Sequence, residues 1–146
     1  MTGSSILFLC TGNSCRSQMA EGWLRHLGRG RYEVESAGTE PSVVNPTAIR
    51  VMAEVGIDLS RPRSKHVREF LGRDFDVVVT VCDQARESCP VFPGCPVVAH
   101  WPIPDPARFE GPEAARLEHF REIRDRIGGL IRGLVERDSE GETPVP

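Results

Sequence analysis

A short apolar run that stops at a cysteine and leads into a helix constrains this chain more than any other feature. Residues 6–9 read Ile-Leu-Phe-Leu, and Cys10 is followed by five residues before Arg16 and Ser17. A buried strand that ends where a helix begins turns loop N–H groups and the positive end of the helix dipole toward one point. The sequence therefore predicts an anion-binding loop with a cysteine at its base.

The residue types in this loop fit a nucleophile aimed at a phosphate-like ion. Loop N–H donors favour the thiolate of Cys10, which is the reactive form. The guanidinium of Arg16 can clamp two oxygens of a tetrahedral anion. Ser17 can either cap the helix or donate to the Cys10 sulfur. Gly12 permits close approach of the backbone, and Asn13 suits a left-handed turn position. The expected oxyanion-binding residues are Thr11, Gly12, Asn13, Ser14, Cys15 and Arg16, with Cys15 contributing its N–H rather than its sulfur.

A less specific interpretation stands beside this one. A cysteine at the end of an apolar strand is usually a small buried hydrophobic residue, and Gly-Asn pairs are ordinary in turns. The spacing from Cys10 to Arg16 and Ser17 at a strand-to-helix junction is much more specific, and it favours the nucleophile.

Strands and helices alternate along the chain. Strands are expected at residues 6–9, 32–36, 75–81 and 97–99, and helices at 17–28, 45–56, 64–71 and from 113 to about 135. This alternation predicts an α/β fold with a parallel sheet covered on both faces. In such sheets ligands bind beyond the carboxyl ends of the strands. Cys10, Ser36, Cys82 and the segment around Asp105 all follow predicted strands, so they can converge at one edge.

Composition sets wider limits. The 146 residues fit a single domain at 1–136 followed by a flexible tail at 137–146. A net charge of −3 gives no reason to expect nucleic acid or an acidic membrane as partner. The apolar run near the N-terminus is too short for a signal peptide or a membrane span, so we expect a cytoplasmic protein. We also expect a monomer. Five cysteines in a reducing compartment point to chemistry rather than to structural disulfides.

Asp105 is the candidate general acid. It lies in Pro102-Ile103-Pro104-Asp105-Pro106, a segment stiffened by three prolines. A carboxylic acid held rigidly over the anion can protonate a leaving oxygen. An aspartate that simply initiates a turn before proline is the alternative.

Cys82 and Cys89 form a second candidate pair. Six residues separate them without glycine or proline, and a helix over this distance would rise about 10 Å, too far for a disulfide without unwinding. Core packing for Cys82, a chance loop position for Cys89, and a zinc site that adds Cys95 and His100 are alternatives. The intervals of six, five and four residues are poor zinc spacing. With Cys10 present, a redox relay is favoured.

Four segments together resemble the thioredoxin-coupled arsenate reductases of the low-molecular-weight tyrosine phosphatase family. They are Cys10 to Ser17, Ser36-Ala37-Gly38-Thr39, Val81-Cys82-Asp83 through Cys89-Pro90, and His100-Trp101 through Asp105-Pro106. The resemblance implies a three-layer sandwich with a central parallel sheet of about four strands. It also implies arsenate as substrate, phosphate or sulfate as mimics, and thioredoxin as reductant. The implied catalytic residues are Cys10, Arg16, Ser17, Cys82, Cys89 and Asp105, with no organic cofactor or catalytic metal.

Two departures from the family pattern bear on function. Ala107 and Arg108 stand where the phosphatases carry aromatic residues that pack on a phosphotyrosine ring. Some relatives bind potassium near the loop, and Asn13, Glu21 and Ser36 resemble part of that site, but Ser64-Lys65 replaces its acidic residue. No cation is therefore expected. The alternatives are a phosphatase in which Cys82 and Cys89 give redox protection, and a non-catalytic oxyanion-binding module.

Overall fold

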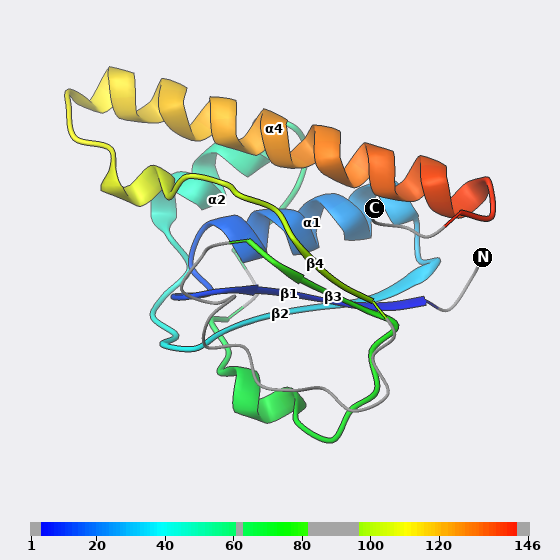
Figure 1. Ribbon diagram of the computed structural model, residues 1–146. Coiled ribbons are helices and arrows are strands. Elements are labelled where there is room, and N and C mark those ends of the chain that lie inside the picture. Colours follow the sequence, from blue (N-terminus) through cyan, green and yellow to red (C-terminus); the bar gives the residue numbers. More distant parts are fainter. Residues whose placement is uncertain (1–3, 61–62, 82–96, 143–146) are drawn as a thin grey trace.

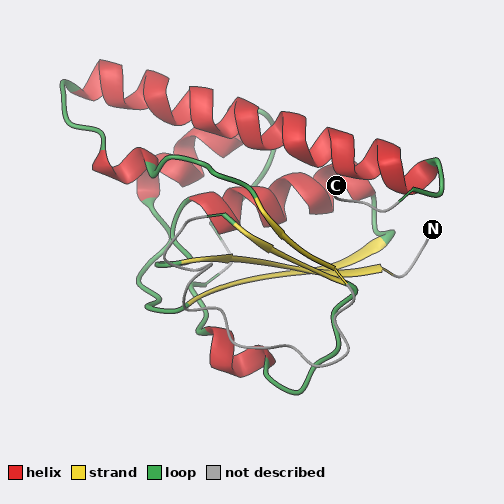
Figure 2. Ribbon diagram, in the orientation of Figure 1, coloured by secondary structure: helices red, strands yellow, loops and turns green. Residues whose placement is uncertain are grey.

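A four-stranded parallel sheet forms the centre of the computed structural model, which describes residues 4–60, 63–81 and 97–142 (Figures 1 and 2). The strands are β1 (Ser4–Cys10), β2 (Tyr32–Gly38), β3 (Val77–Thr80) and β4 (Val97–His100), in the order β2-β1-β3-β4. The predicted parallel α/β sheet of about four strands is confirmed.

β1 is an inner strand of the sheet and its most buried one. Residues 6–9 are fully buried, as expected for a strand paired on both sides and covered on both faces. Its register places Cys10 opposite Gly38 of β2 and Leu9 opposite Thr80 of β3. The carboxyl ends of these three strands therefore meet at one edge.

Helices lie on both sides of the sheet, which makes three layers (Figure 1). α1 (Arg16–Gly28), α2 (Pro46–Ala53) and α4 (Glu113–Ser139) cover one face, and the 3₁₀ helix η1 (Val67–Phe70) lies on the other. α1 and α4 cross closely at Gly128, where a Cβ would lie 2.8 Å from the Trp23 ring. The Trp23 indole N–H also donates to the carbonyl of Arg124 at 3.0 Å, so the crossing is tied by a hydrogen bond.

The helices near residues 45–56 and 64–71 form where expected, but they are shorter. Asn45 caps α2 by accepting hydrogen bonds from the N–H groups of Thr47 and Ala48. Residues 67–70 form only a 3₁₀ turn, η1, with a capping box between His66 and Glu69.

α4 ends later than expected, because residues 137–139 are helical where the composition predicts a tail. Asp138 is only 6 % exposed and accepts a hydrogen bond of 2.8 Å from the hydroxyl of Tyr32, which anchors this last turn to the start of β2. None of the helices in the described part of the chain combines the length and apolar character that crossing a bilayer requires.

Candidate active site

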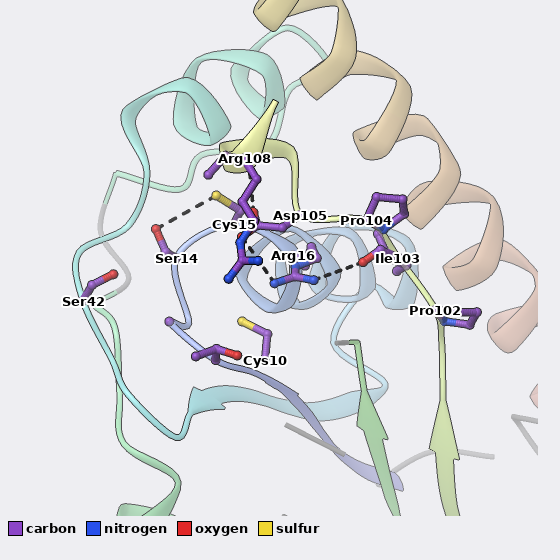
Figure 3. Close-up of a pocket in the computed structure, with 13 residues that line it drawn as sticks. Cys10, Ser14, Cys15, Arg16, Ser42, Pro102, Ile103, Pro104, Asp105 and Arg108 are labelled. Atoms are coloured by element: carbon purple, nitrogen blue, oxygen red, sulfur yellow. Dashed lines mark hydrogen bonds and ion pairs between the residues drawn. The ribbon is translucent and has the colours of Figure 1, made fainter. Parts of the chain in front are cut away.

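A pocket of about 720 Å³ opens at the carboxyl edge of β1 (Figure 3). The loop at residues 10–16 forms one side, the segment at residues 102–108 forms another, and Ser42 lies at the border. The pocket therefore joins the two segments expected to hold the nucleophile and the acid.

The loop is held by its carbonyl groups. Every carbonyl from residue 10 to residue 15 accepts a hydrogen bond from a donor outside the loop. For the carbonyls of residues 10 to 15, taken in that order, the donors are Thr39 N at 3.3 Å, Glu40 N at 2.9 Å, Ser42 N at 3.0 Å, Ser64 Oγ at 2.8 Å, Asn45 N at 3.0 Å and Met19 N at 2.9 Å. In a trans peptide the N–H points opposite to the preceding carbonyl, and the described residues contain no cis bond. The N–H groups of residues 11–16 therefore point away from these donors, toward the side of the loop where Cys10 Sγ and the pocket lie, and that of Asn13 donates to Cys10 Sγ.

Asn13 sits at the bend of the loop. It adopts the left-handed conformation with φ of 47° and is fully buried. Its N–H donates to the Cys10 sulfur at 3.2 Å. The expectation that Asn13 takes a left-handed turn position is confirmed.

The hydroxyl of Ser17 is in hydrogen-bond contact with the Cys10 sulfur. The N–H of Lys65 donates to the Asn13 side chain at 2.8 Å, which identifies the accepting atom as the amide oxygen. The amide nitrogen of Asn13 then donates to Ser17 Oγ at 2.8 Å. Ser17 Oγ lies 2.8 Å from Cys10 Sγ, and either atom can be the donor while Cys10 is a thiol; once Cys10 is a thiolate, only the Ser17 hydroxyl can donate. In the thiolate form the sulfur therefore has two donors, the Ser17 hydroxyl and the Asn13 N–H, an arrangement that stabilises the thiolate.

The sequence left two roles open for Ser17, and its contacts select the one at Cys10. α1 begins instead after Cys15, whose side chain makes no capping hydrogen bond.

Gly38 lies in one of the segments that carry the family resemblance, but the sequence assigned it no role at the site. A Cβ at this position would lie 2.3 Å from the carbonyl oxygen of Thr11 and 2.8 Å from the N–H nitrogen of Asn13. Only glycine lets β2 run this close to the loop. Gly12, which was singled out, differs: a Cβ there would make ordinary contacts, the nearest at 3.4 Å from Ser42 Oγ. Close approach of an anion to Gly12 stays a prediction.

Cys10 and Cys15 are both buried thiols at the loop, but their surroundings differ. Burial, with a smaller contribution from the nearby Asp105 carboxylate, raises the pKa of Cys15 to about 12. Cys15 therefore stays protonated at neutral pH, which agrees with a backbone rather than a sulfur contribution.

The two carboxylate oxygens of Asp105 have different surroundings (Figure 3). Oδ1 accepts a hydrogen bond of 3.0 Å from the N–H of Ala107 and so caps η2 (Pro106–Arg108). Oδ2 lies 3.7 Å from the guanidinium of Arg16 and 3.7 Å from that of Arg108. Arg16 is further fixed by a hydrogen bond of 3.0 Å to the carbonyl of Ile103. Asp105 thus caps a turn with one oxygen and keeps the other beside the anion clamp.

The structure brings together Cys10, Arg16, Ser17 and Asp105. Cys82, Cys89 and Cys95 lie outside the described residues, and so does most of the alternative zinc site. Val81, the residue before Cys82, donates its N–H to the carbonyl of Leu9 at 2.8 Å. The chain therefore leaves β3 directly beside the strand that ends at Cys10. His100 bonds Thr80 Oγ1 through its Nδ1 at 2.9 Å.

Asn13, Glu21 and Ser36, the residues that resemble part of a potassium site, lie beside a positively charged side chain of the protein, that of Lys65. The ammonium of Lys65 lies 3.7 Å from Glu21 Oε1, and Ser36 Oγ donates to the same oxygen at 2.6 Å. A metal cation at this place would meet an ammonium where an anionic ligand is needed. These residues do not fit a bound potassium ion.

The chain matches the family described as low molecular weight phosphotyrosine protein phosphatase over residues 5–140. The chain belongs to this family. Within it, the chain is 43 % identical over 136 residues to an arsenate reductase of Halalkalibacterium halodurans, covering 93 % of this chain and 98 % of that one. An arsenate reductase of Bacillus subtilis is 42 % identical over the same shares of the two chains.

Solved structures of the family share the fold. An arsenate reductase in its oxidized state matches with a TM-score of 0.80 at 35 % identity, covering 92 % of this chain and 98 % of that one. A thioredoxin-dependent arsenate reductase of Corynebacterium glutamicum matches with a TM-score of 0.77 at 27 % identity, covering 97 % of this chain and 64 % of that one. A tyrosine phosphatase of the family from T. tengcongensis matches with a TM-score of 0.74 at 26 % identity, covering 92 % and 99 %. The expected low-molecular-weight phosphatase-like fold is confirmed.

Proposed function

We propose that this protein reduces arsenate to arsenite with Cys10 as nucleophile and a disulfide relay that thioredoxin resets. The observation that carries the proposal is the Cys10 sulfur, which as a thiolate has two hydrogen-bond donors at the base of a loop whose N–H groups point to the side where the pocket lies. The curated relatives named arsenate reductase support this substrate over a phosphate ester.

In the first step the thiolate of Cys10 attacks arsenic. The N–H groups of residues 11–16 and the guanidinium of Arg16 hold the oxyanion, and phosphate or sulfate would bind there as mimics. Asp105 protonates the leaving oxygen, which departs as water. The distance of 3.7 Å between Asp105 Oδ2 and the Arg16 guanidinium supports this role.

In the second step Cys82 attacks the Cys10 sulfur. The sulfur–arsenic bond breaks, its electron pair stays on arsenic, and arsenite leaves as a Cys10–Cys82 disulfide forms. Cys89 then attacks Cys82, which frees Cys10 and moves the disulfide to Cys82–Cys89. The dithiol of thioredoxin reduces this disulfide, so two electrons enter for each arsenate reduced. No organic cofactor or catalytic metal has a part in this sequence, and the reducing cytoplasm suits it. We propose a monomer as the acting form.

Phosphate monoester hydrolysis is the second candidate, because the same loop and acid would serve it. The rim of the pocket disfavours an aryl ester. Ala107 and the 85 % exposed side chain of Arg108 line it, and none of the described residues that line the pocket is an aromatic that could stack on a phenyl ring. Tyr32, the chain's one tyrosine, lies at the opposite end of the sheet, paired with Ser4. We therefore expect weak hydrolysis of aryl phosphates beside the main activity.

Arsenate-dependent consumption of NADPH in the presence of thioredoxin and thioredoxin reductase tests the proposal. The protein should sustain many turnovers, and omitting thioredoxin should stop them. Vigorous hydrolysis of an aryl phosphate without arsenate-dependent NADPH consumption would instead identify a phosphatase.

A further inference from the structure

We propose that the ammonium group of Lys65 is a built-in cation that holds the anion-binding loop in shape and makes a bound monovalent metal ion unnecessary. Lys65 is thus a positioning residue. The proposal rests on the oxyanion site proposed above but not on the cysteine relay, so the two can fail separately.

Lys65 is unusual in this chain for its identity and its surroundings. It is the single lysine among 18 basic residues. Its side chain is only 11 % exposed, although lysine normally keeps its ammonium in water. The ammonium lies 3.7 Å from Glu21 Oε1 and donates to the carbonyl of Arg63 at 3.3 Å.

Glu21 explains why a cation is needed at this place. Its side chain is 7 % exposed, and a carboxylate this buried is costly without counter-charges and hydrogen bonds. Arg25, itself half exposed, donates to Oε2 at 2.9 Å. Oε1 accepts from Ser36 Oγ at 2.6 Å and faces Lys65. Oε2 of Glu21 is thus paired with Arg25 on the solvent side, and Oε1 is paired with Lys65 in the interior.

The backbone of Lys65 connects this ion pair to the loop. Its N–H donates to Asn13 Oδ1 at 2.8 Å, and its carbonyl accepts from the N–H of Gly38 at 2.8 Å. Asn13 in turn donates a hydrogen bond from its side-chain Nδ2 to Ser17 Oγ and one from its backbone N–H to Cys10 Sγ. By pairing with Glu21 on α1, the ammonium therefore fixes the position of the backbone that orients the donors at Cys10.

The charges also argue against a further cation. Glu21 carries one negative charge and has two positive partners, Lys65 and Arg25. A metal ion beside Oε1 would face the ammonium at short range, and the described residues offer no second carboxylate in contact with Lys65 to balance it. Removal of the ammonium would reverse this, because it would leave Glu21 Oε1, with Ser36 Oγ bonded to it, beside an emptied volume.

Two variants separate charge from space. Lys65→Ala removes the ammonium and opens its volume, whereas Lys65→Met removes the charge but fills most of the volume. Both retain the N–H and the carbonyl that bond Asn13 and Gly38. The measurements are the dissociation constant of inorganic phosphate and the melting temperature, each in potassium chloride and in choline chloride at equal ionic strength. Neither readout needs the cysteine relay.

The wild-type protein should give the same phosphate affinity in both salts. In choline chloride both variants should bind phosphate about tenfold more weakly or worse, because the buried carboxylate has lost its interior counter-charge. Potassium should restore most of the affinity and melting temperature of Lys65→Ala and little of those of Lys65→Met.

Potassium-dependent phosphate binding by the wild type would overturn the proposal, as would wild-type affinity in Lys65→Met. If either single variant is poorly folded, the double change Glu21→Gln with Lys65→Met removes both charges. It should regain melting temperature over Lys65→Met alone, and no regain would contradict the ion pair. Retained phosphate binding with no arsenate reduction would refute the proposed function and leave this inference intact.

Discussion

Gly38→Ala should disable the loop without replacing any residue that is proposed to hold the anion. The added Cβ would lie 2.3 Å from the Thr11 carbonyl oxygen and 2.8 Å from the Asn13 nitrogen, and both neighbours are backbone atoms. A carbon and an oxygen in contact need roughly 3.2 Å, so the strand and the loop must separate by about 1 Å. A misplacement of about 1 Å in a positioned site can lower the rate about 100-fold.

The same overlap should lower stability. Overpacking of a well-packed interior typically costs about 1–3 kcal/mol. For a domain of this length that corresponds to a fall in melting temperature of roughly 2–12 °C. Turnover of a small aryl phosphate by the reduced protein measures the loop alone, because it bypasses the cysteine relay. Differential scanning calorimetry measures the stability.

Gly129→Ala is the matched control, because a Cβ at this helical position has no atom within 4 Å. It should raise the free energy of unfolding by up to about 1 kcal/mol and leave turnover unchanged. Wild-type turnover in Gly38→Ala would refute the argument that the close approach of β2 shapes the loop.

Three further predictions concern individual ionisable groups. Asp105→Asn should lower turnover by about two to four orders of magnitude, the usual share of a general acid, while phosphate affinity measured by calorimetry holds or improves; weak phosphate binding with normal turnover would contradict the role of acid. Cys15 should react with iodoacetamide far more slowly than Cys10 at neutral pH, since its pKa of about 12 leaves less than about one part in 10⁴ as thiolate, and equal labelling by mass spectrometry would refute this. Hydrogen bonds from Arg121 lower the pKa of Glu54 to about 2, so its stabilisation is complete above about pH 4.5 and is lost as the pH falls toward 2. The pair is one-third exposed, so Glu54→Gln should cost about 1 kcal/mol or less in urea unfolding at neutral pH; a cost that stays constant down to pH 2 would contradict the pairing.

The parts of the site that depend on neighbours in the sequence were predictable. The strand ending at Cys10, the left-handed Asn13 and the start of α1 follow from residue types spaced a few positions apart. The sheet followed from the alternation of apolar strands and amphipathic helices.

The parts that depend on distant segments were not predictable from local patterns. The donors that engage the loop carbonyls come from residues 39–45 and from Ser64, whose positions depend on how β2 and η1 pack. Gly38 belongs to one of the segments that carry the family resemblance, and that was the available signal, but its need for a missing Cβ appears only beside Thr11. The single lysine of an arginine-rich chain was the corresponding signal for Lys65. The last turn of α4 was missed because a buried bond from Tyr32, more than 100 residues away, outweighs its polar composition.

The count of arsenite released by Cys89→Ser tests the central claim most directly, because this change leaves the whole anion site intact. With thioredoxin, thioredoxin reductase and excess arsenate, Cys10 should still attack and Cys82 should still resolve. The protein should then release one arsenite per chain and stop as a Cys10–Cys82 disulfide, while its phosphatase activity in the reduced state equals that of the wild type. Continued arsenite release at the wild-type rate would contradict the relay.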